Sequence, residues 1–126
     1  MKILTPLLLF IPLVFACSEN KYEFLIKDES FKNNFIISSN EDFIELSEGF
    51  TYYKWKNKSS NKSPIVLVHG FSVPSYIWEP TFKMLAEKGY YVIMLDLYGR
   101  GYSENLKKAY TDELLANQVI NLLEEW

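Results

Sequence analysis

The sequence predicts an α/β fold, in which an antiparallel hairpin precedes a parallel strand–helix–strand unit and one further helix. Two continuous apolar runs, Ile65–Val68 and Tyr91–Leu95, are typical of parallel strands that are covered on both faces. Between the runs, apolar residues recur from Trp78 at positions i, i+4, i+7 and i+8, which is the spacing of one helix face. The whole unit has about the 30 residues of a βαβ motif.

The hairpin is expected directly before this unit. Phe43–Ser47 alternates imperfectly between apolar and polar residues, and Glu48-Gly49 is typical of a tight turn. Phe50–Trp55 is rich in the aromatic and β-branched residues that strands favour. The two segments therefore predict an antiparallel pair.

Helix boundary signals complete the predicted order of elements. Gly89 is a favourable stop for the helix between the parallel strands. Thr111 can cap a further helix, with Asp112 and Glu113 in its first turn. The apolar face of this helix would consist of Leu115, Val119, Leu122, Leu123 and Trp126.

The N-terminal segment predicts export. Lys2 precedes a nearly continuous apolar run that is shorter than the roughly 18 residues of a spanning helix, so residues 1–16 are expected to be a signal peptide. The run ends in Val14-Phe15-Ala16-Cys17, which resembles the bacterial lipobox. This resemblance implies that Cys17 carries lipid and anchors the protein to a membrane of a bacterial cell envelope. Plain secretion and an uncleaved anchor are the alternatives.

Residues 17–40 combine charges, Asn and Ser with scattered Phe and Ile. They would form either a tether to the domain or a peripheral segment with a strand at Phe35–Ile37. Residues 41–126 would then hold the globular domain.

Composition excludes several classes of function. The formal net charge is −3 and the basic residues do not cluster, so a nucleic-acid partner has no electrostatic support. A single cysteine cannot form an internal disulfide, and a single histidine excludes a multi-histidine metal site. We therefore expect no metal and no nucleic acid.

Two loops carry the chemistry. His69-Gly70-Phe71 follows the first apolar strand, where Gly70 would allow a sharp turn and leave the Phe71 amide free to stabilise an oxyanion. The second loop, Asp96 to Ser103, follows the next apolar strand. Both loops would lie at the carboxyl ends of parallel strands, where open α/β sheets bind ligands.

Together these motifs resemble the N-terminal part of an α/β-hydrolase, of the esterase, epoxide-hydrolase and carbon–carbon-bond hydrolase branch. The resemblance implies that Phe71 supplies an oxyanion-hole amide and that His69 is structural. It implies hydrolysis of a small molecule through a covalent intermediate, without a cofactor. The other matching residues, which would support the motifs beside the active site, are Gly70, Asp96, Gly99, Gly101 and Ser103. Phe71, Trp78 and Tyr98 are candidate pocket aromatics, although Trp78 also suits the core.

The 126 residues do not contain the Gly-x-Ser-x-Gly motif that carries the nucleophile in this family. No complete catalytic set is therefore expected, and the fold is expected to be partial, with the C-terminal half of the hydrolase domain absent. One hypothesis is a secreted or membrane-tethered serine hydrolase of the esterase type, of which this is the N-terminal portion. The alternative is a non-catalytic lipoprotein or binding module.

Three residue patterns allow a second interpretation. His69 could be a catalytic base, although that role belongs to a later loop in the family. Ser72 half resembles a nucleophile, but Pro74 replaces the second glycine of the elbow. Gly99-x-Gly101 could belong to a dinucleotide site, but Glu104 stands where the third glycine should be.

Overall fold

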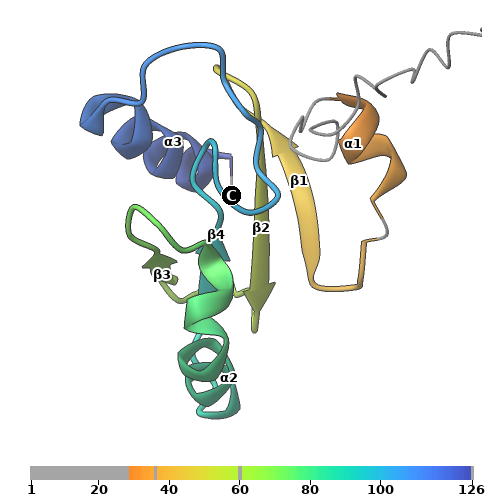
Figure 1. Cartoon of the computed structure of the whole chain (residues 1–126). Coiled ribbons are helices and arrows are strands. Elements are labelled where there is room, and N and C mark those ends of the chain that lie inside the picture. Colours follow the sequence, from red (N-terminus) through yellow and green to blue (C-terminus); the bar gives the residue numbers. More distant parts are fainter. Residues whose placement is uncertain (1–28, 36, 60, 126) are drawn as a thin grey trace, which may run out of the picture.

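Four strands form one mixed sheet in the order β1-β2-β4-β3 (Figure 1). The strands of this computed structural model are β1 (Glu41–Glu45), β2 (Phe50–Lys56), β3 (Ile65–Val68) and β4 (Val92–Leu95). β2 is antiparallel to both β1 and β4, whereas β3 is parallel to β4. The predicted hairpin and parallel pair are both confirmed. The structure describes residues 29–35, 37–59 and 61–125.

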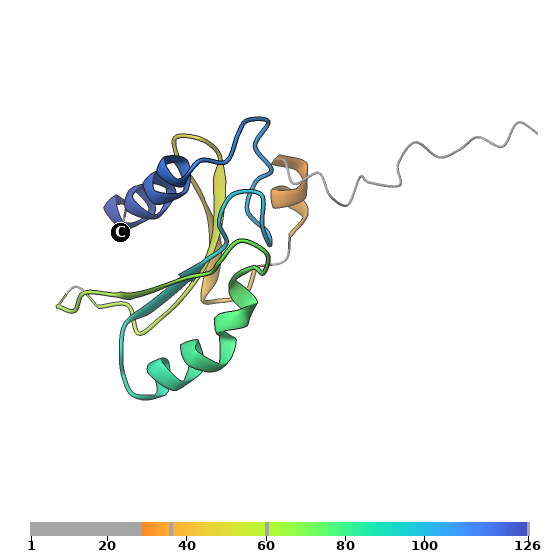
Figure 2. The ribbon, with the colours of Figure 1, turned by 60° about the vertical axis from the view of Figure 1, so that its left-hand side comes forward.

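Two helical segments cover opposite faces of the sheet (Figure 2). The 3₁₀ helix η2 (Ser75–Trp78) leads into α2 (Glu79–Glu87), and α3 (Asp112–Glu124) follows the second loop. The residues expected to begin and end these helices have those roles in the structure. Thr111 Oγ1 accepts from the amide of Leu114 at 3.2 Å, and Gly89 ends the α2 region with a φ of +79°.

The alternation of side chains along β4 explains its unbroken apolar sequence. Val92 and Met94 belong to the cluster under α2, whereas Ile93 and Leu95 belong to the cluster that packs against Leu122 of α3. Successive strand residues face opposite sides of a sheet, so a strand covered on both sides needs apolar residues at every position. β4 is therefore the most buried strand of the sheet. Because both of its faces are packed, the backbone from which the next loop emerges is held in place.

A short helix, α1 (Glu29–Asn34), packs beside the hairpin through aromatic rings. The ring centroids of Phe35 and Phe43 lie 5.2 Å apart, and those of Phe35 and Tyr102 lie 4.8 Å apart. The sequence did not predict this helix. Phe35 and Ile37 do not form the strand considered for 35–37; residue 36 lies outside the described residues.

Several expectations concern residues whose structure is not described. The signal peptide, Cys17 and Trp126 all lie outside the described residues. Over the part of the chain that is described, no helix combines the length and apolar character needed to cross a bilayer.

Candidate active-site loops

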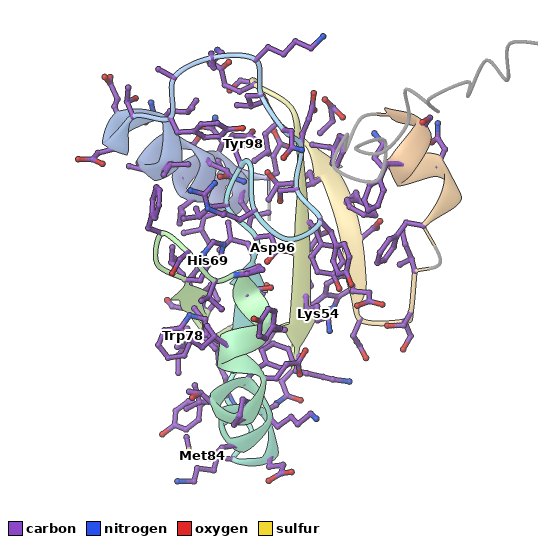
Figure 3. All side chains as sticks on the ribbon, viewed as in Figure 1. Lys54, His69, Trp78, Met84, Asp96 and Tyr98 are labelled. Carbon is purple, nitrogen blue, oxygen red and sulfur yellow. The ribbon has the colours of Figure 1, made fainter. Side chains whose placement is uncertain are left out.

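The two loops named by the sequence meet at one edge of the sheet. Val68 and Leu95 are paired at the carboxyl ends of parallel β3 and β4, so the residues that follow them emerge side by side. Figure 3 shows His69 and Asp96 close together at this edge. The amide of Leu97 donates to Nε2 of His69 at 2.9 Å and joins the second loop to the first.

His69 is held by backbone contacts on both of its ring nitrogens. An amide N–H can only donate, so Nε2 of His69 is an acceptor and the neutral ring carries its proton on Nδ1. Nδ1 then donates to the carbonyl oxygen of Gly70 at 2.7 Å. The ring is buried and both nitrogens have backbone partners, so the geometry does not fit a catalytic base.

This contact orients the Phe71 amide. The carbonyl of Gly70 and the N–H of Phe71 belong to one peptide group, and none of the peptide bonds among the described residues is cis. In a trans peptide the two groups point in opposite directions. The carbonyl faces the buried imidazole, so the N–H faces away from it. Among the described residues, the Phe71 N–H has no hydrogen-bond partner.

Asp96 ties the two loops together with its carboxylate. Oδ1 accepts from the amide of Ser75 at 2.7 Å, and Oδ2 accepts from the amide of Tyr102 at 2.8 Å. Only 2% of the Asp96 surface is exposed. Hydrogen bonds to an ionised carboxylate are stronger than those between neutral groups. The Asp96 carboxylate therefore clamps the two loops to each other.

The two glycines of the second loop are required by close packing. Gly101 has a φ of +48°, and a Cβ on it would lie 1.9 Å from Oδ2 of Asp96. Gly99 has a φ of +73°, and a Cβ there would lie 2.8 Å from the ring of Tyr110. Side chains rarely adopt these angles, and here they would also collide.

Ser103 and Gln118 complete the support of this loop. The hydroxyl of Ser103 donates to the Asp96 carbonyl and accepts from the amide of Tyr52 at 2.9 Å. Gln118 on α3 accepts from the amide of Tyr98 at 2.9 Å and donates to Thr51 Oγ1 at 2.8 Å. Sequence reasoning missed Gln118, because a glutamine on an amphipathic helix gives no sign that it will be buried.

As a result, nearly every amide of the second loop has a hydrogen-bond acceptor. Residues 96–100 and 102–104 all donate, either to backbone carbonyls or to His69, Asp96 and Gln118. Glu104 accepts from the amide of Phe50 at 3.0 Å, so its carboxylate binds the hairpin. The loop is thus a structural unit, and nothing in this geometry supports the dinucleotide interpretation.

Three other candidate residues do not have the local geometry that their proposed roles would require. Gly70 has no positive φ, and a Cβ on it would meet no atom within 4 Å, so the expected need for glycine's backbone freedom is not seen. Ser72 is exposed, and helix η2 begins only at Ser75, so no elbow forms around it. Trp78 packs against the cluster under α2, which is the core alternative. Its indole Nε1 is buried without a partner among the described residues.

A cavity of about 400 Å³ lies where the two loops approach α3. Tyr98 is one of its wall residues and is almost fully buried, with its hydroxyl donating to the Gly49 carbonyl at 3.1 Å. Burial raises the pKa of Tyr98 above its ordinary value. The lining residues are His69, Gly70, Phe71, Leu97, Tyr98, Arg100, Tyr110, Asp112 and Leu115.

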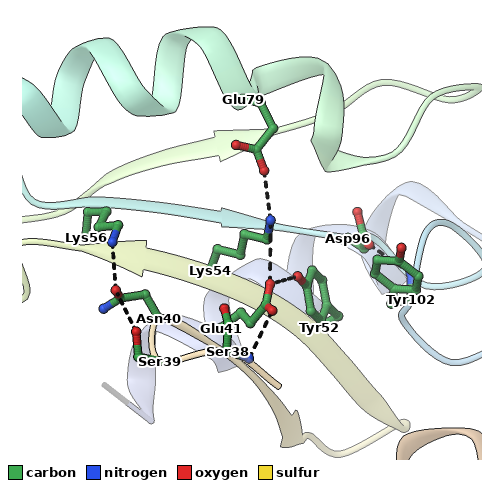
Figure 4. Close-up of polar contacts among 10 residues, drawn as sticks. All are labelled: Ser38, Ser39, Asn40, Glu41, Tyr52, Lys54, Lys56, Glu79, Asp96 and Tyr102. Carbon is green, nitrogen blue, oxygen red and sulfur yellow. Dashed lines mark hydrogen bonds and ion pairs between the residues drawn. The ribbon is translucent and has the colours of Figure 1, made fainter. Parts of the chain in front are cut away.

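A separate polar network joins the hairpin to α2 (Figure 4). Lys54 Nζ lies 2.8 Å from Glu79 and 3.5 Å from Glu41, and the hydroxyl of Tyr52 donates to Glu41. Burial alone would raise the pKa of Glu41, but its hydrogen bonds with Tyr52 and Ser38 lower it overall. Burial and Glu41 both raise the pKa of Tyr52. These groups satisfy one another, so the network stabilises the fold beside the loops.

No group of three or more His, Cys, Asp or Glu residues suited to a metal ion occurs in the described part of the chain. The polar groups at the loops are backbone amides and carbonyls held by buried side chains.

The class of protein follows from the sheet and its loops. Parallel strands ending in His-Gly-Phe and in a clamped Asp-x-x-Gly-x-Gly-x-Ser loop define the N-terminal part of an α/β-hydrolase core. A family model described as the alpha/beta hydrolase fold matches residues 63–125. The chain belongs to this family.

Relatives agree with this assignment. The chain is 36% identical over 62 residues to pimeloyl-[acyl-carrier protein] methyl ester esterase of Aliivibrio salmonicida, a match that covers 49% of this chain and 23% of that protein. The chain thus spans about a quarter of this curated relative.

The similarity to solved structures covers more of the chain than the family match does. The enol-lactonase of Burkholderia xenovorans has a TM-score of 0.59 at 26% identity, over 65% of this chain and 32% of its own. A haloalkane dehalogenase from Paraglaciecola agarilytica has a TM-score of 0.65 over 79% of this chain and 36% of its own. At 18% identity the latter shows the fold alone.

Proposed function

We propose that the chain is the oxyanion-hole-bearing, N-terminal portion of a serine hydrolase that acts on a small carboxylic ester. The observation that carries the proposal is the Phe71 amide, which His69 turns outward and which has no partner among the described residues. The match to a methyl ester esterase supports the ester class. The cavity of about 400 Å³ beside Phe71 has the size of a small-molecule site.

The chemistry assigned to Phe71 is electrostatic. When a nucleophile attacks an ester carbonyl, the carbonyl oxygen becomes an oxyanion, and a fixed amide donor stabilises the transition state more than the ground state. The chain would supply this donor and part of the pocket wall. The serine nucleophile, its base and its acid would come from polypeptide beyond the 126 residues, because no Gly-x-Ser-x-Gly motif occurs within them.

The test starts from the reading frame that encodes these residues. We expect the frame to continue past the Trp126 codon and to encode Gly-x-Ser-x-Gly within about 40 residues, because in this family the motif lies on the turn after the next strand. The complete product should hydrolyse p-nitrophenyl esters, and a serine-to-alanine change in that motif should abolish turnover. The 126-residue chain by itself should be no faster than its denatured form.

A stop codon at that point, together with an inactive product, would contradict the hydrolase proposal and favour the non-catalytic lipoprotein or binding module. Ester turnover by the 126-residue chain that disappears in Ser72→Ala would contradict it differently, because Ser72 would then be the nucleophile.

We also propose that the protein is exported and anchored to a bacterial envelope membrane through lipid on Cys17. The support is the position of Cys17 directly after Ala16 at the end of an apolar leader. Cys17→Ala should release the protein from the membrane fraction or leave an unprocessed precursor. Unchanged mass and unchanged membrane partitioning in this variant would contradict the proposal.

A further inference from the structure

The Phe71 side chain needs a restraint that the core does not provide. Phe71 is 86% exposed, and its loop leaves β3 at the edge of the described sheet. His69 orients the peptide group before Phe71, through the Gly70 carbonyl. Among the described residues, His69 makes no hydrogen bond with the peptide group after Phe71, so it holds only one of the two peptide groups that flank this residue.

Arg100 restrains that second peptide group. Its Nε donates to the carbonyl oxygen of Phe71, and its guanidinium carbon lies 4.7 Å from the centre of the Phe71 ring. The hydrogen bond fixes the backbone, and the cation–π contact fixes the side chain over it. One residue therefore holds Phe71 at two points.

Arg100 is itself fixed by the well-bonded second loop. Its Nη1 donates to the Gly99 carbonyl at 3.1 Å, and its amide donates to the Leu97 carbonyl at 3.0 Å. Gly99 has a φ of +73°, and its amide donates to Glu104 at 2.8 Å. The guanidinium thus connects the loop after β4, whose amides nearly all have acceptors, to the exposed loop after β3.

We propose that Arg100 is a positioning residue for the Phe71 amide: it transmits the rigidity of the loop after β4 to the oxyanion donor of the loop after β3. The catalytic meaning of this restraint rests on the proposed hydrolase function, whereas the restraint itself does not. Phe71 is the group that would touch the reacting oxygen, and Arg100 would act only through it.

A matched pair of variants separates the hydrogen bond from general effects. Glutamine places its amide nitrogen at the position that Nε has in arginine, so Arg100→Gln keeps the donor for the Phe71 carbonyl. Arg100→Met has a similar length without any donor. Lys107→Met is the control, since Lys107 is exposed in the same connection between β4 and α3.

The measurement is ¹⁵N relaxation on the full 126-residue chain. We expect a Phe71 amide order parameter of about 0.85 in the wild type and in Lys107→Met, and below about 0.6 in Arg100→Met. Arg100→Gln should retain most of the wild-type value. The thermal midpoint should be nearly unchanged in all variants, because the Arg100 side chain contacts an exposed ring and loop carbonyls in the described part of the chain.

Phe71→Leu is a second variant that cannot unfold the core, because it alters an exposed side chain. It should lower the order parameter partly, through loss of the ring contact. A Phe71 order parameter that is low in the wild type, or unchanged in Arg100→Met, would overturn the proposal.

In the complete hydrolase, Arg100→Met should lower kcat on the order of 10- to 100-fold and leave KM unchanged, with Arg100→Gln near wild type. An unchanged kcat alongside a mobile Phe71 would overturn the catalytic part of the proposal. A wild-type product without hydrolase activity would instead contradict the proposed function, and the relaxation data would still decide whether Arg100 restrains Phe71.

Discussion

The loops after β3 and β4 leave the same edge of the sheet but are stabilised in opposite ways. In the loop after β4, nearly every amide has an acceptor, and Asp96, Ser103 and Gln118 are buried inside it. In the loop after β3, Phe71 is exposed, and its amide has no partner among the described residues. Buried amides need partners, so an amide left without one, as at Phe71, is available to a ligand. The comparison teaches that the loop after β4 is a structural scaffold, whereas the loop after β3 presents an amide donor without a partner among the described residues.

Among substitutions in the loop after β4, we expect a change at Asp96 to lower the free energy of unfolding most. In Asp96→Asn, one side-chain oxygen becomes an NH₂ that faces the amide of Ser75 or Tyr102, so an acceptor is replaced by a donor. Each bond to a buried charge contributes about 1.5 to 3 kcal/mol, so we expect a loss of at least about 3 kcal/mol in unfolding free energy. Urea denaturation measures it.

Asp112→Asn is the matched control for Asp96→Asn, because it makes the same chemical change at an exposed residue in the first turn of α3. It should lose less than about 1 kcal/mol. Equal losses in the two variants would mean that the Asp96 clamp is unimportant.

Glycine substitutions compare the two loops directly. Gly101→Ala should lose about 2 kcal/mol or more, because a Cβ would both adopt a φ of +48° and displace the Asp96 carboxylate. Gly70→Ala should change stability by less than about 0.5 kcal/mol, since a Cβ there meets no atom within 4 Å. Thermal unfolding of both variants checks this, and the reverse order would refute the comparison.

The contribution of α3 to the scaffold can be tested at Gln118. Gln118→Leu leaves the buried amide of Tyr98 without an acceptor, and we expect a loss of about 2 kcal/mol. Asn117→Leu, at the adjacent exposed position, should stay within about 0.5 kcal/mol of wild type. If both variants behave alike in urea denaturation, Gln118 does not support the loop.

Alkaline pH should weaken the scaffold through Tyr98. Its pKa in the folded protein is raised, chiefly by burial, above the ordinary value of 10.0 that applies to the unfolded chain. Above that pH the unfolded chain releases a proton that the folded protein retains. Stability contributed by this group is therefore complete below about pH 10 and falls by up to about 1.4 kcal/mol per pH unit above it.

Tyr98→Phe should make the decline in stability above about pH 10 less steep, because one of the groups that cause it is gone. Tyr52, Tyr53 and Tyr91 also have raised pKa values, so a residual slope is expected. Urea denaturation over a pH series measures both slopes. Identical slopes in wild type and variant would show that Tyr98 does not contribute.

The sequence predicted the sheet well because its signals are local. The apolar run of β4, the stop at Gly89 and the cap at Thr111 each depend on a few neighbouring residues, and all three occur in the structure. α1 was not predicted, because its short sequence has poor periodicity. It is held by Phe31 and Phe35 against rings that come from the hairpin and the second loop.

The sequence indicated which two loops meet at the edge of the sheet, but not the side-chain contacts that hold these loops in place. The positions of His69 and Asp96 after parallel strands placed them together. The contacts of Arg100 with Phe71 and of Gln118 with Tyr98 join distant segments, and no local pattern encodes such pairs. Gly70 shows the opposite error, since the expected backbone requirement is not found in its φ or its surroundings.

The most direct test of the account removes the Phe71 N–H and leaves the side chain in place. Phenyllactic acid incorporated at position 71 replaces the amide by an ester and keeps the side chain. In the complete hydrolase we predict a loss in kcat of about 10² to 10³-fold with KM nearly unchanged, because one oxyanion donor is missing. The thermal midpoint should fall only slightly, because the Gly70 carbonyl still accepts from His69 Nδ1, although an ester carbonyl is a weaker acceptor. A kcat equal to that of the wild type would contradict the assignment of Phe71 as the oxyanion donor.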